Sequence, residues 1–449
     1  MQFELTKDFI DQIIISIKRN ENEFLVDKLH SLHPVDIAEI MRVVNLPQAQ
    51  YIFRLLGEEL SSDVLVEIEE DVREKFLESL SAEEIAETLE MMYADDATDV
   101  IQDLPEDVQE EVLDAIKDDE HSSEISMLLN YEEDSAGGIM DLDFISANWN
   151  WTVSKALSKF REQVEEVDQV YTIYVVDSEQ RLKGTLSLKS FLYASDDTLI
   201  KDIFQSDPIS VEVEDEAESV ASKMEKYDLV VIPVVNEKGE LLGRITIDDA
   251  LDVIKEEAEK DYQMASGISE KVESTDSLFV ISRARLPWLL IGMLGGILGA
   301  YVIGMFEGHI RENAVMASFI PLILAMGGNV GVQSSAIIVQ SLANNTLNYD
   351  SIAKKMLKEL LVALFNGLIC SFIALIFCWI TKSDFDLALT IGVSLVAVFT
   401  YAGLFGTFVP LVLNKYDIDP ALATGPFITT TNDIIGLLIY FLIGWALYF

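Results

Sequence analysis

An abrupt change in composition near residue 285 constrains this chain more than any other feature of its sequence. Up to Arg285 charged residues are dense, whereas from Leu286 onward nine acids and six bases are scattered among long apolar runs. Five of these runs are long enough for a helix that crosses a bilayer, which needs about 20 residues. They lie at about 286–306, 314–342, 359–380, 386–413 and 421–448. The sequence therefore predicts a charged part followed by a polytopic α-helical transmembrane domain at 282–449.

The charged part is strongly acidic. The chain has 77 acidic and 31 basic residues and a net charge of −46, and all but nine of the acids precede Leu286. Such a charge disfavours nucleic acid as a partner and favours cations. The two cysteines, Cys370 and Cys378, share one apolar run, which indicates neither a disulfide nor a zinc site. The first residues lack the pattern of a signal peptide, so the charged part is expected to be cytosolic.

The charged part contains two regions with different periodicity. Residues 1–135 have apolar residues at three- and four-residue spacing, as in HPVDIAEIMRVV and SAEEIAETLEMM, which predicts an acidic domain of stacked helical hairpins in a superhelix. Two strand pairs follow, VYTIYVVDSEQRLKGTLSL and LVVIPVVNEKGELLGRITI, each flanked by helical patterns. The order strand, helix, strand, strand, helix therefore occurs twice, at 136–196 and at 197–251.

This doubled βαββα pattern resembles the tandem CBS domain, a regulatory α/β pair. The second copy ends in GRITIDD, residues 243–249, which is similar to the G-x-x-T-x-x-D ending of that family. The first copy, GTLSLKS at 184–190, lacks the final acid. The resemblance implies at most one adenine-nucleotide site in each chain, with ATP as the ligand and with Thr246 and Asp249 as the contacts.

Residues 252–281 connect this pair to the apolar part. They begin with the polar helical pattern LDVIKEEAEKDYQMA. Most such stretches are linker helices with a solvated face. The position of this one, between a regulatory module and a membrane domain, makes a mechanical coupler the alternative.

Asp433 lies in the last apolar run, which contains no Lys, Arg or His. A carboxylate in the bilayer is costly unless it lines water or binds a cation. At about 1.5 Å per residue, Asp433 lies roughly 18 Å beyond Ala421, near the middle of the membrane. Thr429 is four residues earlier and shares its helix face. Gly425 and Pro426 predict a break near the cytosolic end of this run.

The second apolar run contains the polar motif GGNVGVQSS at 327–335. Two interpretations remain open for it. Its small residues suit close helix packing, and Asn329 and Gln333 suit a pore wall that holds a hydrated ion. Oxygen donors with few carboxylates favour a hard cation that keeps most of its water, which is typical of Mg²⁺.

Taken in order, these motifs resemble the MgtE family of magnesium channels and transporters over nearly the whole chain. The most specific are GGNVGVQSSA in the second run and DPALATGPFITTTNDIIG in the fifth. The resemblance implies a homodimeric, Mg²⁺-selective channel of the cell (inner) membrane, in which Asp433 holds hydrated Mg²⁺. It also implies a plug helix at about 252–278. Gly425 departs from the Asn that some members have before the proline, which puts an amide ligand there in question.

The resemblance further implies that cytosolic Mg²⁺ screens facing carboxylates and so closes the channel. The candidate regulatory ligands are Asp95, Asp96, Asp99, Asp228, Asp248, Asp249, Asp252, Glu256, Glu257, Glu259 and Asp419.

Basic residues predict the orientation of the membrane domain. Arg283 and Arg285 precede the first run, and Lys354, Lys355 and Lys358 follow the second, in what the sequence predicts to be a loop. The positive-inside rule then places the N-terminus in the cytosol and, after five crossings, the C-terminus outside.

Three other functions compete with the channel. The first is a secondary transporter of divalent cations (Mg²⁺ or Co²⁺), coupled to protons or other ions, in which Asp433 carries a proton. The second is a CBS-gated anion channel, which the lack of basic residues within the runs disfavours. The third is a membrane enzyme, for which the sequence shows no Ser/His/Asp or Cys/His constellation. The sequence contains no G-x-x-x-x-G-K-[ST] motif, which disfavours ATP-driven pumping.

Overall fold

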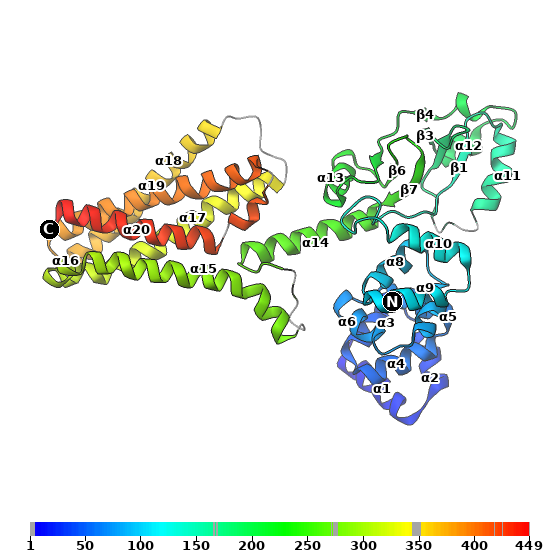
Figure 1. Ribbon diagram of the computed structural model, residues 1–449, viewed down its shortest axis with the longest axis horizontal. Helices are drawn as coiled ribbons and strands as arrows, with labels where there is room; N and C mark the ends of the chain where they lie inside the picture. Colours follow the sequence, from blue (N-terminus) through cyan, green and yellow to red (C-terminus); the bar gives the residue numbers. More distant parts are fainter. Residues whose placement is uncertain are drawn as a thin grey trace. The chain divides into compact units, whose positions relative to one another are not determined.

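The computed structural model describes residues 5–164, 167, 169–270, 272, 277–343, 352–416, 418–423 and 425–448. The chain divides into two compact units, Met1–Glu257 and Ala258–Phe449. Figure 1 shows the first unit in blue to green and the second in green to red.

The first unit begins with a helical N domain. Its helices are α1 (Lys7–Arg19), α2 (Asn22–Leu29), α3 (Pro34–Val43), α4 (Leu46–Leu56), α5 (Glu58–Val66), α6 (Glu70–Leu77), α7 (Ala82–Leu89), α8 (Ala94–Gln102), α9 (Glu106–Ala115) and α10 (Asp119–Leu128). Helices two positions apart in the chain pack together, as α3 does with α5 and α7 does with α9. This arrangement is typical of stacked helical hairpins, and it confirms the predicted helical N domain.

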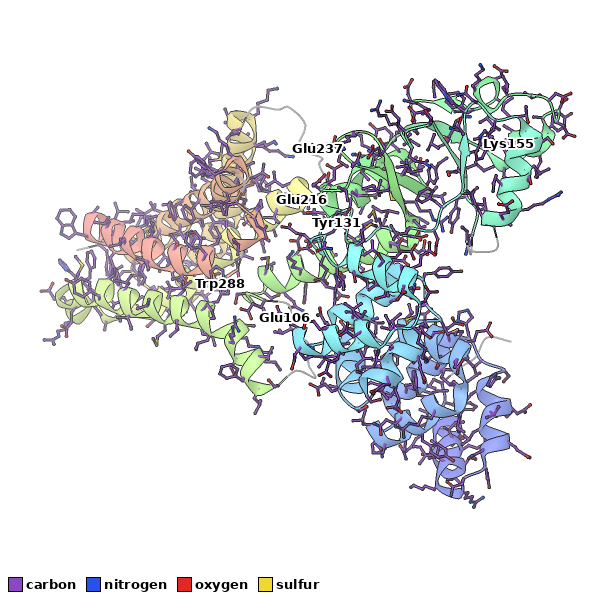
Figure 2. All side chains as sticks on the ribbon, turned by 45° about the vertical axis from the view of Figure 1, so that its right-hand side comes forward. Glu106, Tyr131, Lys155, Glu216, Glu237 and Trp288 are labelled. Atoms are coloured by element: carbon purple, nitrogen blue, oxygen red, sulfur yellow. The ribbon has the colours of Figure 1, made fainter. Side chains whose placement is uncertain are left out.

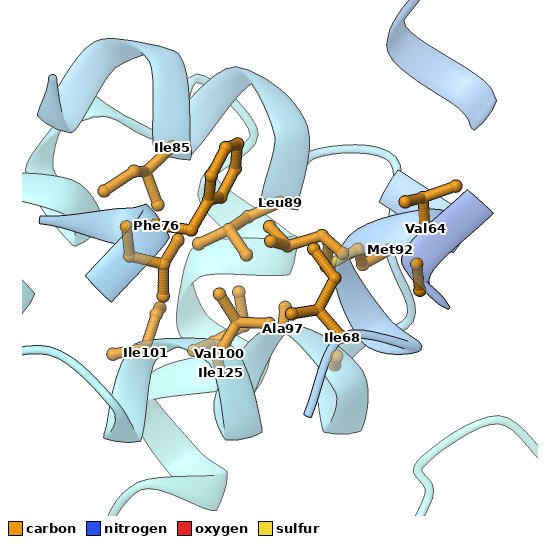
Figure 3. Close-up of a cluster of buried hydrophobic side chains, with 14 of the residues drawn as sticks. Val64, Ile68, Phe76, Ile85, Leu89, Met92, Ala97, Val100, Ile101 and Ile125 are labelled. Atoms are coloured by element: carbon orange, nitrogen blue, oxygen red, sulfur yellow. The ribbon is translucent and has the colours of Figure 1, made fainter. Parts of the chain in front are cut away.

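Local sequence explains where these helices begin and which face they bury. At the start of α7, Ser81 Oγ accepts a hydrogen bond from the Glu84 amide (3.2 Å) and Glu84 Oε2 accepts one from the Ser81 amide (3.1 Å). This reciprocal cap satisfies two amide groups that a helix start would otherwise leave unpaired. The apolar residues that recur along α7 and α8 point inward, where Ile85, Leu89 and Val100 form part of one buried cluster (Figure 3).

Two βαββα copies follow, as predicted. The first contains β1 (Ser146–Asn148), α11 (Val153–Gln163), β2 (Ile173–Val176), β3 (Leu182–Leu186) and α12 (Leu188–Tyr193), with η1 (Ile200–Asp202) and β4 (Gln205–Ser206) after it. The second contains β5 (Val211–Glu212), α13 (Ala217–Tyr227), β6 (Val231–Val235), β7 (Leu241–Thr246) and α14 (Ile247–Ala265). The sheet orders are β1-β2-β3-β4 and β5-β6-β7. In each copy the first strand pairs in parallel with the second, and the second pairs antiparallel with the third, which is the expected topology.

The segment after the N domain pairs with the second copy. The amides of Ala136 and Gly137 donate to the carbonyls of Asp215 (2.7 Å) and Val213 (2.9 Å). The sequence boundary at residue 136 had assigned this segment to the first copy. One buried apolar cluster contains residues of both the N domain and the second copy, whereas the first copy has a separate core. The N domain is therefore packed together with the second copy.

Helix α14 ends earlier than the sequence predicts. It runs continuously out of the second copy and stops at Ala265, not near residue 278. Gly267 then adopts a φ of 82°, a left-handed conformation that ends a helix at little cost in glycine. The Gln263 side chain closes the turn, because its amide donates to the carbonyl of Val272 (2.9 Å) and accepts from the Val272 amide (3.0 Å).

The second unit contains five helices that are long and apolar enough to cross a membrane, counted among the described residues. The elements are α15 (Leu278–Met305), α16 (Glu307–Glu312), η2 (Ala314–Phe319), α17 (Ile320–Ala343), α18 (Ile352–Ile380), α19 (Phe385–Lys415), η3 (Pro420–Ala423) and α20 (Pro426–Leu447). Helix α19 packs against α17, α18 and α20, and α15 packs against α20. The predicted polytopic helical domain is confirmed.

Some of its helices begin at other residues than the sequence predicts. Helix α15 begins at Leu278 and α18 at Ile352, so Lys354, Lys355 and Lys358 lie on a helix rather than in the predicted loop. Apolar length marks only the part of a helix inside the hydrocarbon, and a helix can extend beyond it into the polar boundary. The predicted break before the fifth helix is confirmed, since α20 begins at Pro426.

The two units differ in surface chemistry. Exposed carboxylates stand out from the first unit, among them the labelled Glu106, Glu216 and Glu237 (Figure 2). On the second unit, large apolar side chains are exposed along α15 and α18, including Leu289, Met293 and Phe365. A surface of this kind suits contact with lipid.

Candidate functional site

The four residues predicted to line a pore surround a single cavity. Asn329 and Gln333 of α17 and Thr429 and Asp433 of α20 all line a cavity of about 450 Å³. The other lining residues are Leu324, Ala325, Gly328 and Val332. The sequence thus predicted the polar part of the lining. The structure adds apolar lining residues, all of which belong to α17.

The two interpretations of the polar motif concern opposite faces of α17. On the packing face, a Cβ added to Gly331 would lie 1.9 Å from Asn432 Nδ2, and one added to Gly406 of α19 would lie 2.3 Å from the carbonyl oxygen of Gly331. The glycines therefore allow three helices to meet closely. On the other face Asn329 and Gln333 are exposed and line the cavity.

Contacts on α20 fix the orientation of Asp433. The side chain of its neighbour Asn432 is buried and donates from Nδ2 to the carbonyl of Gly327 (3.3 Å). Because successive helical residues point about 100° apart, this contact directs Asp433 to another face, where it lines the cavity half-buried. Thr429 Oγ1 donates to the Gly425 carbonyl (3.0 Å), which leaves its lone pairs as acceptors. Within the described ranges, no Lys, Arg or His forms an ion pair with Asp433.

The start of α20 is in contact with the end of α14. Gly425 has a φ of 53° and a ψ of −121°, and a Cβ there would lie 2.5 Å from the carbonyl oxygen of Ala265. A Cβ on Gly267 would lie 2.6 Å from Cγ of Pro426. An asparagine at position 425 would clash in this conformation, so the glycine is required by the close approach of the two segments.

The first unit contains an acid cluster, which we define as Asp95, Asp96 and Asp99 of α8, Asp249 of α14, and Asp141. Desolvation raises the pKa of the half-buried Asp96 to about 6 and that of the more exposed Asp99 to about 7, and the nearby Asp249 charge raises both further. Burial also raises the pKa of Asp95 well above its usual range, with Asp141 and Asp96 adding to the effect. The N domain and the second copy thus bring carboxylates together at a cost in repulsion.

Two partners relieve part of this repulsion. Thr246 donates from its amide (3.1 Å) and from its hydroxyl (2.5 Å) to Asp249 Oδ2, which opposes the effect of burial on the pKa of that carboxyl. Arg244 forms a buried ion pair with Asp141 (2.8 Å). Sequence reasoning did not select Asp141. Its partner is more than a hundred residues away, so no local pattern signals the pair.

The remaining predicted regulatory acids are more dispersed. Asp248 adjoins Asp249. Burial raises the pKa of Glu67, and the charge of Asp252 raises it further. Asp228 directly follows α13. Glu256 and Glu257 lie two turns beyond Asp249 on α14, and Glu259 on the same helix belongs to the second unit. Asp419 Oδ1 accepts a hydrogen bond from the Ala421 amide (2.8 Å). Across the described residues, no three acids, histidines or cysteines are arranged to ligate one metal ion directly.

The acid cluster predicts an inverse dependence of stability on pH. Carboxylates with raised pKa values bind protons more tightly in the folded state than in the unfolded state, so stability falls as pH rises from about 4 to about 7. We expect the thermal midpoint of the metal-free protein in detergent to drop by roughly 5 °C over this range. The D96N/D99N variant should flatten the curve, and an unchanged slope in that variant would contradict the assignment.

Family models match three parts of the chain. The model of the divalent cation transporter, MgtE, matches residues 320–443, that of the MgtE intracellular N domain matches 32–134, and that of the CBS domain matches 200–256. These parts correspond to the membrane helices from α17 to α20, the helical N domain and the second βαββα copy. The predicted domain types are therefore confirmed.

Full-length relatives extend the similarity over the whole chain. The magnesium transporter MgtE of Bacillus subtilis is 30% identical over 442 residues, which covers 98% of this chain and 97% of that protein. The magnesium transporter MgtE of Enterococcus faecalis is 37% identical over 320 residues, which covers 71% of this chain and 70% of that protein.

Two solved structures resemble this chain over a little more than half of its length. The soluble part of a magnesium transporter matches with a TM-score of 0.50 and 31% identity, over 56% of this chain and 99% of that one. The cytosolic domain of the Mg²⁺ channel MgtE in complex with ATP matches with a TM-score of 0.51 and 29% identity, over 54% and 99%. By this similarity along its full length, the chain belongs to the MgtE family of divalent cation transporters and is a multi-pass membrane protein.

Proposed function

We propose that this protein is a Mg²⁺-selective channel that admits Mg²⁺ to the cytosol through the cavity at Asp433. The observation that carries the proposal is the convergence of one carboxylate, two amides and one hydroxyl on a single cavity in the apolar unit. The cavity, about 450 Å³, has room for a cation with six waters, since a water occupies about 30 Å³ in the liquid. The magnesium transporters among the relatives support Mg²⁺ as the ion.

A second copy of the chain would complete the pore. Asn329 and Gln333 are exposed in the single chain although they carry the two amide groups of the cavity. A homodimer that covers this face would place two Asp433 carboxylates about one hydrated ion, and this supports the proposed dimer. The basic residues near the starts of α15 and α18 support a cytosolic N-terminus and an external C-terminus.

The acid cluster is the proposed sensor of cytosolic Mg²⁺. Divalent ions would screen its carboxylates and stabilise the packing of α8 against the second copy, and loss of the ions would release it. Because no three acids among the residues that the structure describes are arranged to ligate one ion directly, we expect Mg²⁺ to be held there through its waters. The other predicted acids, which lie directly after α13, on α14 and directly before η3, are proposed as further sites of the same kind.

Helix α14 is the proposed link from sensor to pore. It begins directly after Thr246, carries Asp249 in its first turn, and ends at Ala265, where the chain meets Gly425 and Pro426. A shift of this helix would therefore act on the first residues of the helix that carries Asp433. ATP is proposed as a second ligand near Thr246 and Asp249, and the ATP complex of the related cytosolic domain supports it.

Flux measurements separate the channel from a proton-coupled transporter. In a channel the membrane potential drives the ion, and moving a divalent cation through 100 mV is worth about 4.6 kcal/mol. We expect Mg²⁺ flux into liposomes containing the protein to follow an imposed voltage and to remain unchanged when a pH gradient is added at the same voltage. Flux driven by the pH gradient at zero voltage would instead favour coupled transport.

A further inference from the structure

A second carboxylate lies within the helices of the membrane unit, away from the cavity. Glu359 is the eighth residue of α18, about 10 Å along the helix, and its side chain is half-buried. The hydroxyl of Ser334 on α17, itself 5% exposed, donates to Glu359 Oε1 at 2.6 Å. In the described part of the chain, no base forms an ion pair with this carboxylate. At 2.6 Å this hydrogen bond is as short as charge-assisted hydroxyl–carboxylate bonds are, and bonds of this kind are stronger than those between neutral groups.

The neighbouring helix leaves space for the carboxylate. A Cβ added to Gly403 of α19 would lie 3.0 Å from Glu359 Oε1 and 3.3 Å from Cβ of Ala363. This close approach brings the carboxylate to the point where α17, α18 and α19 meet. Glu359 therefore contacts the packing face of α17 and not the cavity.

The position of Ser334 on α17 connects this contact to the pore lining. Ser334 directly follows Gln333, and about 100° of helix rotation separates the two side chains. If α17 turned about its axis by a few tens of degrees, Gln333 and Asn329 would move out of the cavity. A contact that fixes Ser334 also fixes these two amides.

We propose that Glu359 is a positioning residue for the pore, which holds α17 through Ser334 so that Asn329 and Gln333 face the cavity. This inference rests on the proposed function of the cavity. The role requires a hydrogen-bond acceptor at residue 359 and does not require a negative charge. Glutamine, which keeps Oε1 as an acceptor, separates the two requirements.

Uptake by four variants tests the proposal in the full-length protein. We expect E359A and S334A each to lower Mg²⁺ uptake by about tenfold, the double variant to be no worse than either, and E359Q to match the wild type. The control is S371A, which removes a buried hydroxyl where α18 meets Gly392 of α19 and should change nothing. Should E359A fail to reach the membrane, S334A removes the same hydrogen bond.

Labelling of a cysteine at residue 333 gives a readout that does not depend on transport. In a background where Cys370 and Cys378 are alanine, Q333C should react with a hydrophilic thiol reagent about fivefold more slowly when E359A is added and at the original rate with E359Q. Unchanged labelling and uptake in E359A would overturn the proposal. A loss of Mg²⁺ uptake in E359Q would overturn it as well. If the cavity is not a pore, labelling still reports whether Glu359 orients α17.

Discussion

Replacing Asp433 by alanine or asparagine is expected to lower Mg²⁺ uptake by more than about tenfold. The carboxylate lines the cavity together with Asn329 and Gln333, and it is the charged member of the lining. Asparagine keeps the size of the side chain and removes its charge, so the hydrated cation loses its main electrostatic partner in a region of low dielectric. Uptake is best followed with an indicator of Mg²⁺ inside liposomes, at matched amounts of protein.

Asp384 offers a matched control for this substitution. It is exposed, and it lies at the N-terminus of α19 outside the cavity. D384N removes the same charge, and it should leave uptake within about twofold of the wild type. Normal uptake in both Asp433 variants would remove the pore assignment, whereas equal losses in D384N and D433N would point to a general effect of charge.

Neutralising the acid cluster should weaken closure by cytosolic Mg²⁺ and leave conduction intact. In D96N/D99N/D249N the carboxylates that repel one another across the N domain and the second copy become neutral amides. Neutral amides attract a hydrated Mg²⁺ ion far less than carboxylates do, so Mg²⁺ no longer adds to the stability of the packed, closed arrangement. We expect the Mg²⁺ concentration that halves the flux to rise more than about tenfold, measured in inside-out vesicles with the cytosolic face accessible.

Three exposed acids of α9 provide the control for this variant. E106Q/D107N/E110Q removes three charges, the same number, from a solvated surface of the same unit. It should close at the wild-type Mg²⁺ concentration. Wild-type closure in the acid-cluster variant would contradict the sensing role, and a loss of maximal flux would show that the cluster does more than regulate.

The sequence predicted the domain types because each carries a strong local signal. Strand pairs around polar turns, helices with acidic starts and long apolar runs are all patterns of neighbouring residues. The cavity lining was predicted for a related reason, since Asp433, Asn329 and Gln333 are chemically out of place in hydrocarbon. Their positions around one cavity come from the structure, and their role toward Mg²⁺ stays a prediction.

Residues with long-range partners escaped prediction. Glu359 is the first residue of the predicted third apolar run, and sequence reasoning did not select it, because its partner Ser334 lies 25 residues away on another helix. The Asp141–Arg244 ion pair joins residues that only the completed fold brings together. The end of α14 at Ala265 depends on the backbone of Gly267 and on its contact with Pro426, which periodicity does not encode.

The core shared by the N domain and the second CBS copy has a consequence for how the chain is synthesised. The first copy has a core of its own that contains only residues close in sequence, so it can fold as soon as it leaves the ribosome. The N domain is made earlier, yet its last apolar partners in β5, α13 and β7 emerge several seconds later, at a translation rate of about 5–20 residues per second. The nascent N domain therefore presents an incomplete apolar surface during that interval, and chaperones that bind such surfaces would find it there.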